Sequence, residues 1–196
     1  YLTAGDIKYQ DTNGDGQITD ADKRRLGKSG KPRGQFGINL NMSYKGFYLS
    51  ALFQGSTKFN MYVAGSLGMQ TGQTYGMPVA YDYQTDFWTP DNRDAQYPRL
   101  MANTALNQNN NYASSDFWLI NGAYLRMKDF QFGYDFKYSL LKNVSWLTRC
   151  KMGISGQNIF TISQATKYGM DPEPSDTNYY GYPVERTIAL TLNLGF

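Results

Sequence analysis

Residues 36–44 are Phe-Gly-Ile-Asn-Leu-Asn-Met-Ser-Tyr, a strict alternation of large apolar side chains with small or polar ones. Successive side chains of a strand point to opposite faces of a sheet, so this period of two predicts a β-strand with one apolar face. The Lys45-Gly46 pair that follows is typical of a tight hairpin turn. The alternation then resumes at Phe47, and we expect a hairpin over residues 34–55.

Further segments of the chain alternate in the same way. We expect a strand pair over residues 123–160 and a closing strand over residues 185–196. In the first strand of the pair, the apolar positions change parity between Met127 and Phe130. This change predicts a β-bulge, with a change of surroundings along the strand as the alternative.

The second face of these strands indicates where they lie. It carries Asn, Ser, Gly, Gln and Thr, whereas the solvent face of a soluble sandwich is rich in charged residues. Small polar side chains suit the interior of a transmembrane barrel, whose strands alternate apolar-out and polar-in over about 10 residues. We therefore predict an all-β chain that forms the C-terminal antiparallel strands of a large transmembrane β-barrel with long extracellular loops. A soluble β-sandwich is the alternative.

The connections differ greatly in length. Lys45-Gly46 is short, whereas residues 56–122 and 162–184 are long. Outer-membrane barrels have short periplasmic turns and long extracellular loops, so we expect both long segments, and the residues before Gly34, to be extracellular. Five strands are too few for a bacterial barrel, which needs an even number and at least about eight. Residues 1–196 are therefore expected to be one C-terminal segment of a larger barrel.

Composition excludes several classes of function. The chain has no histidine and one cysteine, which excludes Ser-His-Asp triads, histidine zinc sites and a disulfide framework. We therefore expect no enzyme. The net charge is +3, and the densest basic cluster, which begins at Lys23-Arg24-Arg25, is better explained as a solvated loop than as a nucleic-acid site. We expect no nucleic-acid partner.

One segment has the pattern of a calcium-binding loop. Residues 11–22 are Asp-Thr-Asn-Gly-Asp-Gly-Gln-Ile-Thr-Asp-Ala-Asp. Alternate oxygen-bearing residues converge on a hard cation in such loops, and a glycine at the sixth position makes the sharp turn. The expected Ca²⁺ ligands are Asp11, Asn13, Asp15, the backbone carbonyl of Gln17, and Asp22. Asp22 replaces the usual bidentate Glu and predicts a weaker site; the alternative is a solvent-exposed turn without an ion.

Two groups of loop residues are weaker candidates. Aromatic side chains of the long connections could stack on a substrate or contact a partner protein, or they could simply fold their own loops. These residues are Phe87, Trp88, Tyr97, Tyr179 and Tyr180. The carboxyl groups of Asp171, Glu173 and Asp176 are close in sequence, but prolines separate them and loops are often acidic, so catalysis by a pair of them is not expected.

Short motifs along the whole chain resemble the C-terminal end of the SusC/RagA-type TonB-dependent outer-membrane transporters. In chain order they are Asp11–Gly16, Tyr44–Phe47 with Phe53–Gly55, Tyr97–Leu100, Ser115–Trp118, Gly122–Lys128, Ser155–Phe160 and Leu192–Phe196. Each motif alone is weak, but together, in this order, they are specific.

The resemblance implies a barrel of about 22 strands with an N-terminal plug. It implies energy from TonB, a SusD-type surface lipoprotein as a lid, and glycans, oligosaccharides or peptides as substrates. Phe196 resembles the signal that the barrel-insertion machinery reads in outer-membrane barrels; the alternative is an ordinary aromatic residue of the closing strand. The expected partners are the rest of the same transporter, the lipoprotein, TonB through the N-terminal part, and lipid of the outer membrane of a Gram-negative bacterium.

We therefore expect these residues to form part of an outer-membrane nutrient importer. The alternative from another class is a soluble or surface-attached β-rich calcium-binding adhesion module. Fractionation distinguishes the two, because the importer follows the detergent-solubilised outer membrane and the adhesion module follows the soluble phase.

Overall fold

The computed structural model describes residues 2–26, 30–62, 85–100, 110–173 and 184–196. The chain divides into two compact units. We call them the sheet unit and the loop unit. The sheet unit contains residues 31–59, 121–175 and 181–196, and the loop unit contains residues 1–30, 60–120 and 176–180.

Among the described residues, regular structure consists of strands and short 3-10 helices. The strands are β1 (Gly34–Tyr44), β2 (Phe47–Thr57), β3 (Asn60–Tyr62), β4 (Leu119–Asn121), β5 (Tyr124–Asp135), β6 (Arg149–Gln157), β7 (Thr161–Ser163) and β8 (Thr187–Gly195). The 3-10 helices are η1 (Asp20–Asp22), η5 (Asn110–Tyr112), η6 (Asp116–Trp118), η7 (Phe136–Tyr138) and η8 (Ala165–Tyr168). No helix in the described ranges is long and apolar enough to span a membrane.

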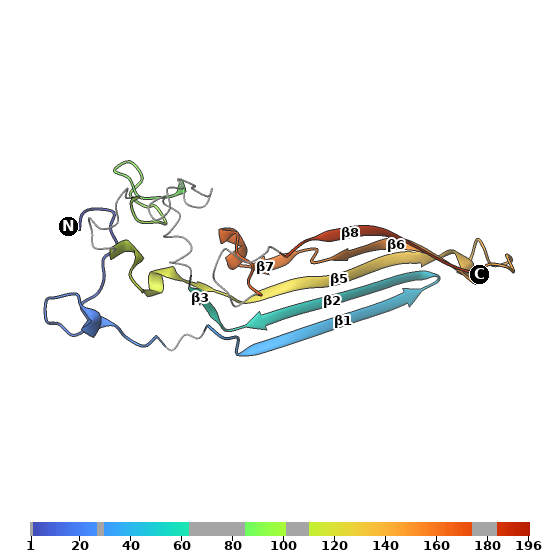
Figure 1. Cartoon of the computed structure of the whole chain (residues 1–196), viewed down its shortest axis with the longest axis horizontal. Helices are drawn as coiled ribbons and strands as arrows, with labels where there is room; N and C mark the ends of the chain where they lie inside the picture. Colours follow the sequence, from blue (N-terminus) through green and yellow to red (C-terminus); the bar gives the residue numbers. More distant parts are fainter. Residues whose placement is uncertain (1, 27–29, 63–84, 101–109, 174–183) are drawn as a thin grey trace. The chain divides into compact units, whose positions relative to one another are not determined.

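The sheet unit is an antiparallel sheet with the strand order β1-β2-β5-β6-β8, and β7 pairs with β5. Figure 1 shows the five long strands side by side. β1 and β2 pair without a break from Gly34 opposite Thr57 to Tyr44 opposite Phe47. The connecting residues have positive φ angles, 46° at Lys45 and 92° at Gly46, as a tight hairpin turn requires. The hairpin expected from the alternation is therefore present.

The bulge expected in the third long strand is confirmed. Leu52 of β2 lies opposite Asp129 of β5, but the next residue, Phe53, lies opposite Met127. Lys128 is therefore an extra residue on β5 without a partner on β2. Because of this extra residue, the apolar side chains before and after it project from the same face of the sheet.

The long segment after β2 contains structure that the alternation of the sequence did not predict. β3 and β4 form a separate two-stranded sheet, and two short 3-10 helices, η5 and η6, precede β4. Met61, Trp118 and Ile120 are buried in this short sheet and beside it. The connection is therefore folded within its described parts.

Candidate functional site

One face of the five-stranded sheet is apolar from edge to edge. Directly paired residues of neighbouring strands share a face, so the strand register defines it. One row across the sheet consists of Met42, Leu49, Phe132, Ile154 and Leu190. The two ends of this row are 62% and 85% exposed. A continuous exposed apolar surface of this kind marks a site that another apolar phase or partner covers.

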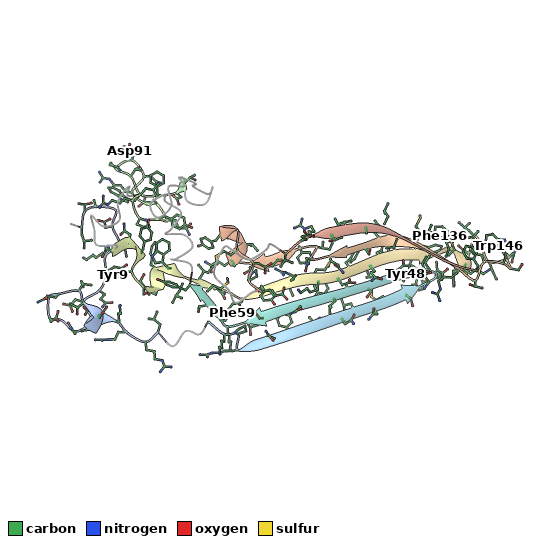
Figure 2. The ribbon with its side chains drawn as sticks, in the orientation of Figure 1. Tyr9, Tyr48, Phe59, Asp91, Phe136 and Trp146 are labelled. Carbon is green, nitrogen blue, oxygen red and sulfur yellow. The ribbon has the colours of Figure 1, made fainter. Side chains whose placement is uncertain are left out.

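The opposite face is polar. The neighbouring row consists of Asn41, Ser50, Gln131, Ser155 and Ala189. On the same face the ring of Tyr48 (Figure 2) lies across the strands, so that a Cβ atom at Gly133 or Gly153 would collide with its hydroxyl. These two glycines therefore provide the space for the tyrosine side chain.

The strand lengths suit a membrane. The five long strands have 11, 11, 12, 9 and 9 residues in the order of the sheet. A tilted strand needs about 9–11 residues to cross the hydrocarbon core. A sheet with one apolar face, one polar face and this length has the physical properties of a barrel wall.

The end of the sheet that carries the short connections is rich in aromatic contacts. We call it the short-turn end; it comprises the Lys45-Gly46 turn and residues 136–148. The N–H of Asp135 donates to the carbonyl of Gly46, and the N–H of Thr148 donates to the carbonyl of Gly195, both at 2.8 Å. The connection therefore reaches from the hairpin turn to the end of β8.

Aromatic side chains cover this end on the apolar face. The rings of Phe47 and Tyr134 make an edge contact with 4.7 Å between their centroids, and those of Tyr134 and Phe136 make one with 5.3 Å. Trp146 stacks on Phe196 with 5.9 Å between the ring centroids and 7° between the planes. Figure 2 labels Phe136 and Trp146 here. The stacked pair is largely exposed, at 66% and 79%.

A buried charge network lies near the other end of β5. The guanidinium of Arg126, whose side chain is 3% exposed, donates to Glu173 at 2.6 Å and to Asp171 at 2.7 Å. Its Nε donates to the hydroxyl of Thr161 at 2.8 Å, and Lys128 shares Glu173 at 2.7 Å. The two carboxyl groups are thus partners of two basic residues from β5.

The loop of residues 11–22 is turned back on itself by hydrogen bonds to its carboxyl groups. Asp11 accepts the N–H groups of Gly14 at 2.6 Å and Gly16 at 2.8 Å. Both glycines have positive φ angles, 78° and 79°, which explains why the loop needs them. The side-chain amide of Asn13 donates to Asp15 at 2.9 Å. Asn13 and Asp15 are therefore in contact, and Asp11 is hydrogen-bonded to the glycine that follows each of them.

Asp22 closes the loop. Its carboxyl group accepts the N–H groups of Thr19 and Thr12, both at 2.8 Å, and it is buried although the rest of the loop is mostly exposed. These hydrogen bonds, that of Thr19 first, lower the pKa of Asp22. Thr19 and Asp22 also form a capping box at the start of η1. The two ends of the twelve-residue motif therefore meet.

The donor chemistry of this loop fits a hard cation, but the carboxyl groups are engaged with backbone N–H groups. In the described ranges, no three Asp, Glu, Cys or His side chains gather in a group able to hold a metal ion. A cation would have to replace hydrogen bonds made by Asp11 and Asp22. All five expected donors are oxygens, and the glycine turns are where such a loop requires them.

The candidate loop aromatics are half-buried within the loop unit. The indole of Trp88 lies against Gly5. The backbone N–H of Trp88 donates a hydrogen bond to the carbonyl of Tyr97 at 2.9 Å. Tyr97 stacks on the buried Trp118 at 6.5 Å, and Phe87 forms an isolated β-bridge with Tyr97. These contacts favour the view that they fold their own loop. Tyr179 and Tyr180 lie outside the described residues.

A polar network joins distant segments of the loop unit. Arg99 holds the buried carboxyl group of Asp6 with two hydrogen bonds, at 2.7 and 3.0 Å, and the amide of Asn111 donates to it at 2.9 Å. Burial raises the pKa of Asp6, but the hydrogen bonds from Arg99, Thr3 and Asn111, with the charge of Arg99, lower it to about 2. Asn111 also accepts the N–H of Ile7.

No protein-family model matches the chain. It is 28% identical over 203 residues to TonB-dependent receptor P3 of Formosa agariphila, which covers 96% of this chain and 19% of the relative. TonB-dependent receptor P26 of the same organism is 28% identical over 205 residues, covering 98% of this chain and 20% of the relative. The chain is thus similar over nearly its whole length to proteins named TonB-dependent receptors. It spans about one fifth of the length of the relatives that it matches.

Solved structures show the same fold. The RagAB peptide importer in the closed-closed state matches with a TM-score of 0.68 and 21% identity, over 92% of this chain and 19% of that chain. The same importer in the open-open state matches with a TM-score of 0.63 and 21% identity, over 97% of this chain and 20% of that chain. The antiparallel sheet is therefore a segment of a β-barrel, as the alternation predicted. These relatives are named receptors and importers, not enzymes.

Sequence reasoning missed Arg126 and Asp6 as centres of charge networks. Arg126 occupies a position of β5 that faces the polar side of the sheet, and this position was the one sign in the sequence that Arg126 makes polar contacts. Its partners follow 45 and 47 positions later, in a connection without periodicity. Nothing in the sequence pairs Asp6 with Arg99, 93 positions away.

Proposed function

We propose that the chain forms barrel wall and extracellular loops of an outer-membrane nutrient importer of the SusC/RagA type, as its C-terminal part. The observation that carries this proposal is the two-faced sheet. The row of paired residues that runs across the strands from Met42 to Leu190 is apolar, and the row from Asn41 to Ala189 is polar. A lipid-facing side and a water-facing side are what a barrel wall needs. The likeness to RagAB and to the TonB-dependent receptors supports it.

The proposal includes partners that lie outside these residues. The plug and the remaining strands of the same transporter complete the barrel, TonB supplies energy through the N-terminal part, and a SusD-type lipoprotein covers the entrance. The substrate class is a glycan, an oligosaccharide or a peptide; the peptide importer RagAB among the structural neighbours is consistent with the last. Phe87, Trp88 and Tyr97 contact the substrate or the lid through the loop surface that they help to fold, and Phe196 is the assembly signal.

We also propose that residues 11–22 bind Ca²⁺ outside the cell. Asp11, Asn13, Asp15, the Gln17 carbonyl and Asp22 supply oxygens, and millimolar calcium suffices for a site with an affinity of about 10⁻⁴ to 10⁻³ M. The role of the ion is structural, because it fixes the half of the loop in which the hydrogen bonds of Asp11, Asn13 and Asp15 are exposed.

The deciding experiment uses the full-length protein in its own cells. Membranes are separated, and nutrient uptake is measured with and without a functional TonB. The importer is expected in the outer-membrane fraction, with uptake that stops when TonB is inactive. Recovery in the soluble phase, with unchanged uptake on loss of TonB, would favour the calcium-binding adhesion module.

A further inference from the structure

The short-turn end of the sheet carries an excess of positive charge next to its aromatic side chains. Its basic residues are Lys45, Lys137 and Lys142, and two charged strand residues border it, Asp135 at the end of β5 and Arg149 at the start of β6. Positive charge beside a lipid-facing aromatic band is a suitable arrangement for attracting anionic headgroups.

The structure separates these cations by role. The ammonium of Lys137 donates to the carbonyls of Leu141 and Val144 and so stabilises the connection itself. Arg149 pairs with Gly195 and therefore has the parity of the polar face. Lys45 and Lys142 remain as exposed cations outside the strands.

One of these cations lies beside an aromatic ring, and the other is on a connection that carries one. The ammonium of Lys45 is 5.2 Å from the ring centre of Tyr44, which has the parity of the apolar face and is 70% exposed. Lys142 lies on the same connection as Trp146, whose ring stacks on Phe196. Phe196 lies two residues after Leu194 and so continues the alternation of the apolar side chains of β8. Aromatic rings at the level of the headgroups therefore have a cation within the same turn or connection.

We infer that the short-turn end binds the phosphate of an anionic phospholipid headgroup, with Lys45 and Lys142 as the cations and Tyr44 and the Trp146–Phe196 pair as the ring platform. This inference rests on the proposed function, because it requires the apolar face to lie in a bilayer. Short connections face the periplasm in outer-membrane barrels, so the lipid belongs to the periplasmic leaflet.

The test uses the full-length transporter, purified in detergent and incubated with phosphatidylglycerol or with phosphatidylethanolamine. Retained lipid is counted by native mass spectrometry. The wild type is expected to retain phosphatidylglycerol preferentially. Each Lys→Gln change should weaken that retention about fivefold, because a cation near an anionic surface contributes about 1 kcal/mol. Added salt should have the same effect by screening.

Two control variants distinguish the headgroup site from general effects. Lys58→Gln removes an exposed cation just after β2, at the opposite end of the sheet, and should leave the lipid preference unchanged. Trp146→Ala removes the ring partner of Phe196 and should reduce retention of both lipids alike.

The outcomes separate this inference from the proposed function. Equal retention of both lipids by an outer-membrane barrel, or an equal loss in Lys58→Gln and in the Lys45→Gln/Lys142→Gln double variant, would overturn the headgroup site alone. A wild-type protein absent from the outer membrane would overturn the proposed function and this inference together.

Discussion

The guanidinium of Arg126 donates a 2.6 Å hydrogen bond to Glu173, a residue 47 positions further along the chain. Between them the chain forms β6, β7 and η8 and then returns to β5. Ala165, Tyr168 and Met170 of the returning segment are buried, and Ala165 is fully so. The ion pair therefore fixes the first part of a long connection to the polar face of the sheet.

Replacement of Arg126 by Met should release this segment. Loss of one partner of a buried ion network costs about 3–5 kcal/mol, and the lower end applies because both carboxyl partners are partly exposed. Hydrogen exchange in the full-length protein is expected to rise at residues 164–173 and to stay unchanged in β1. Arg149→Met, at the start of β6, is the matched control. Unchanged exchange at residues 164–173 would show that packing alone holds the segment.

A charge on the apolar face should prevent insertion of the barrel, whereas the same charge on the adjacent polar position should not. Leu40→Arg places a cation near the middle of β1 on the apolar face and should cost about 2–4 kcal/mol if that point lies at the bilayer midplane. Asn41→Arg is the control on the opposite face. The measurement is the yield of folded barrel in the outer membrane, and equal yields would contradict a lipid-facing apolar side.

The Asp6–Arg99 pair predicts a loss of order in acid. The folded pKa of Asp6 is about 2, below its ordinary value of 3.8, so the pair stabilises the loop unit above pH 3.8 and this contribution is lost as the pH falls toward 2. Hydrogen exchange of residues 2–9, corrected for the intrinsic rate, should increase over that range. Asp6→Asn should remove this pH dependence. If hydrogen exchange depended on pH in the same way in the wild type and in Asp6→Asn, the loss of order in acid would not come from Asp6.

The calcium loop predicts selective effects of its carboxyl groups. Asp11→Ala with Asp15→Ala should abolish calcium binding by the full-length protein, measured by titration calorimetry at millimolar calcium. Asp20→Ala is the matched control, because Asp20 lies in the same loop but pairs with Lys23 at 2.6 Å and is not a proposed ligand. Calcium binding that survives the double change, or that disappears in the control, would refute the site.

Phe196 predicts a defect in assembly that differs from a defect in packing. Phe196→Ala should reduce insertion into the outer membrane if the insertion machinery reads this side chain. Trp146→Ala removes the stacked partner and leaves Phe196 in place. Insertion levels are measured by surface labelling. Equal defects in the two variants would show that the stacked pair matters only for packing.

Much of the sheet was predictable from the sequence, because alternation is a local property. The parity of residues 36–44 predicted β1, and the parity change near Phe130 predicted the bulge. The short β3–β4 sheet was not predictable, since its strands have three residues each and lie 56 residues apart. Three residues are too few to show a period of two.

The candidate site was predictable only in part. The oxygens of residues 11–22 follow a fixed spacing, so their donor chemistry was evident, but the backbone hydrogen bonds of Asp22 were not. The charge networks of Arg126 and Asp6 depend on tertiary contacts between segments far apart in sequence. Local patterns carry no information about such partners.

The extra residue at Lys128 limits how β5 can change in length. Before Lys128 the odd-numbered residues of β5 face the apolar side, and after Lys128 the even-numbered residues do. Removal of one residue within either half would turn part of that half over and exchange its apolar and polar side chains. Single-residue insertions or deletions in this strand should therefore be tolerated only beside a compensating change. The bulge thus determines which length variants of this strand natural or designed relatives can have.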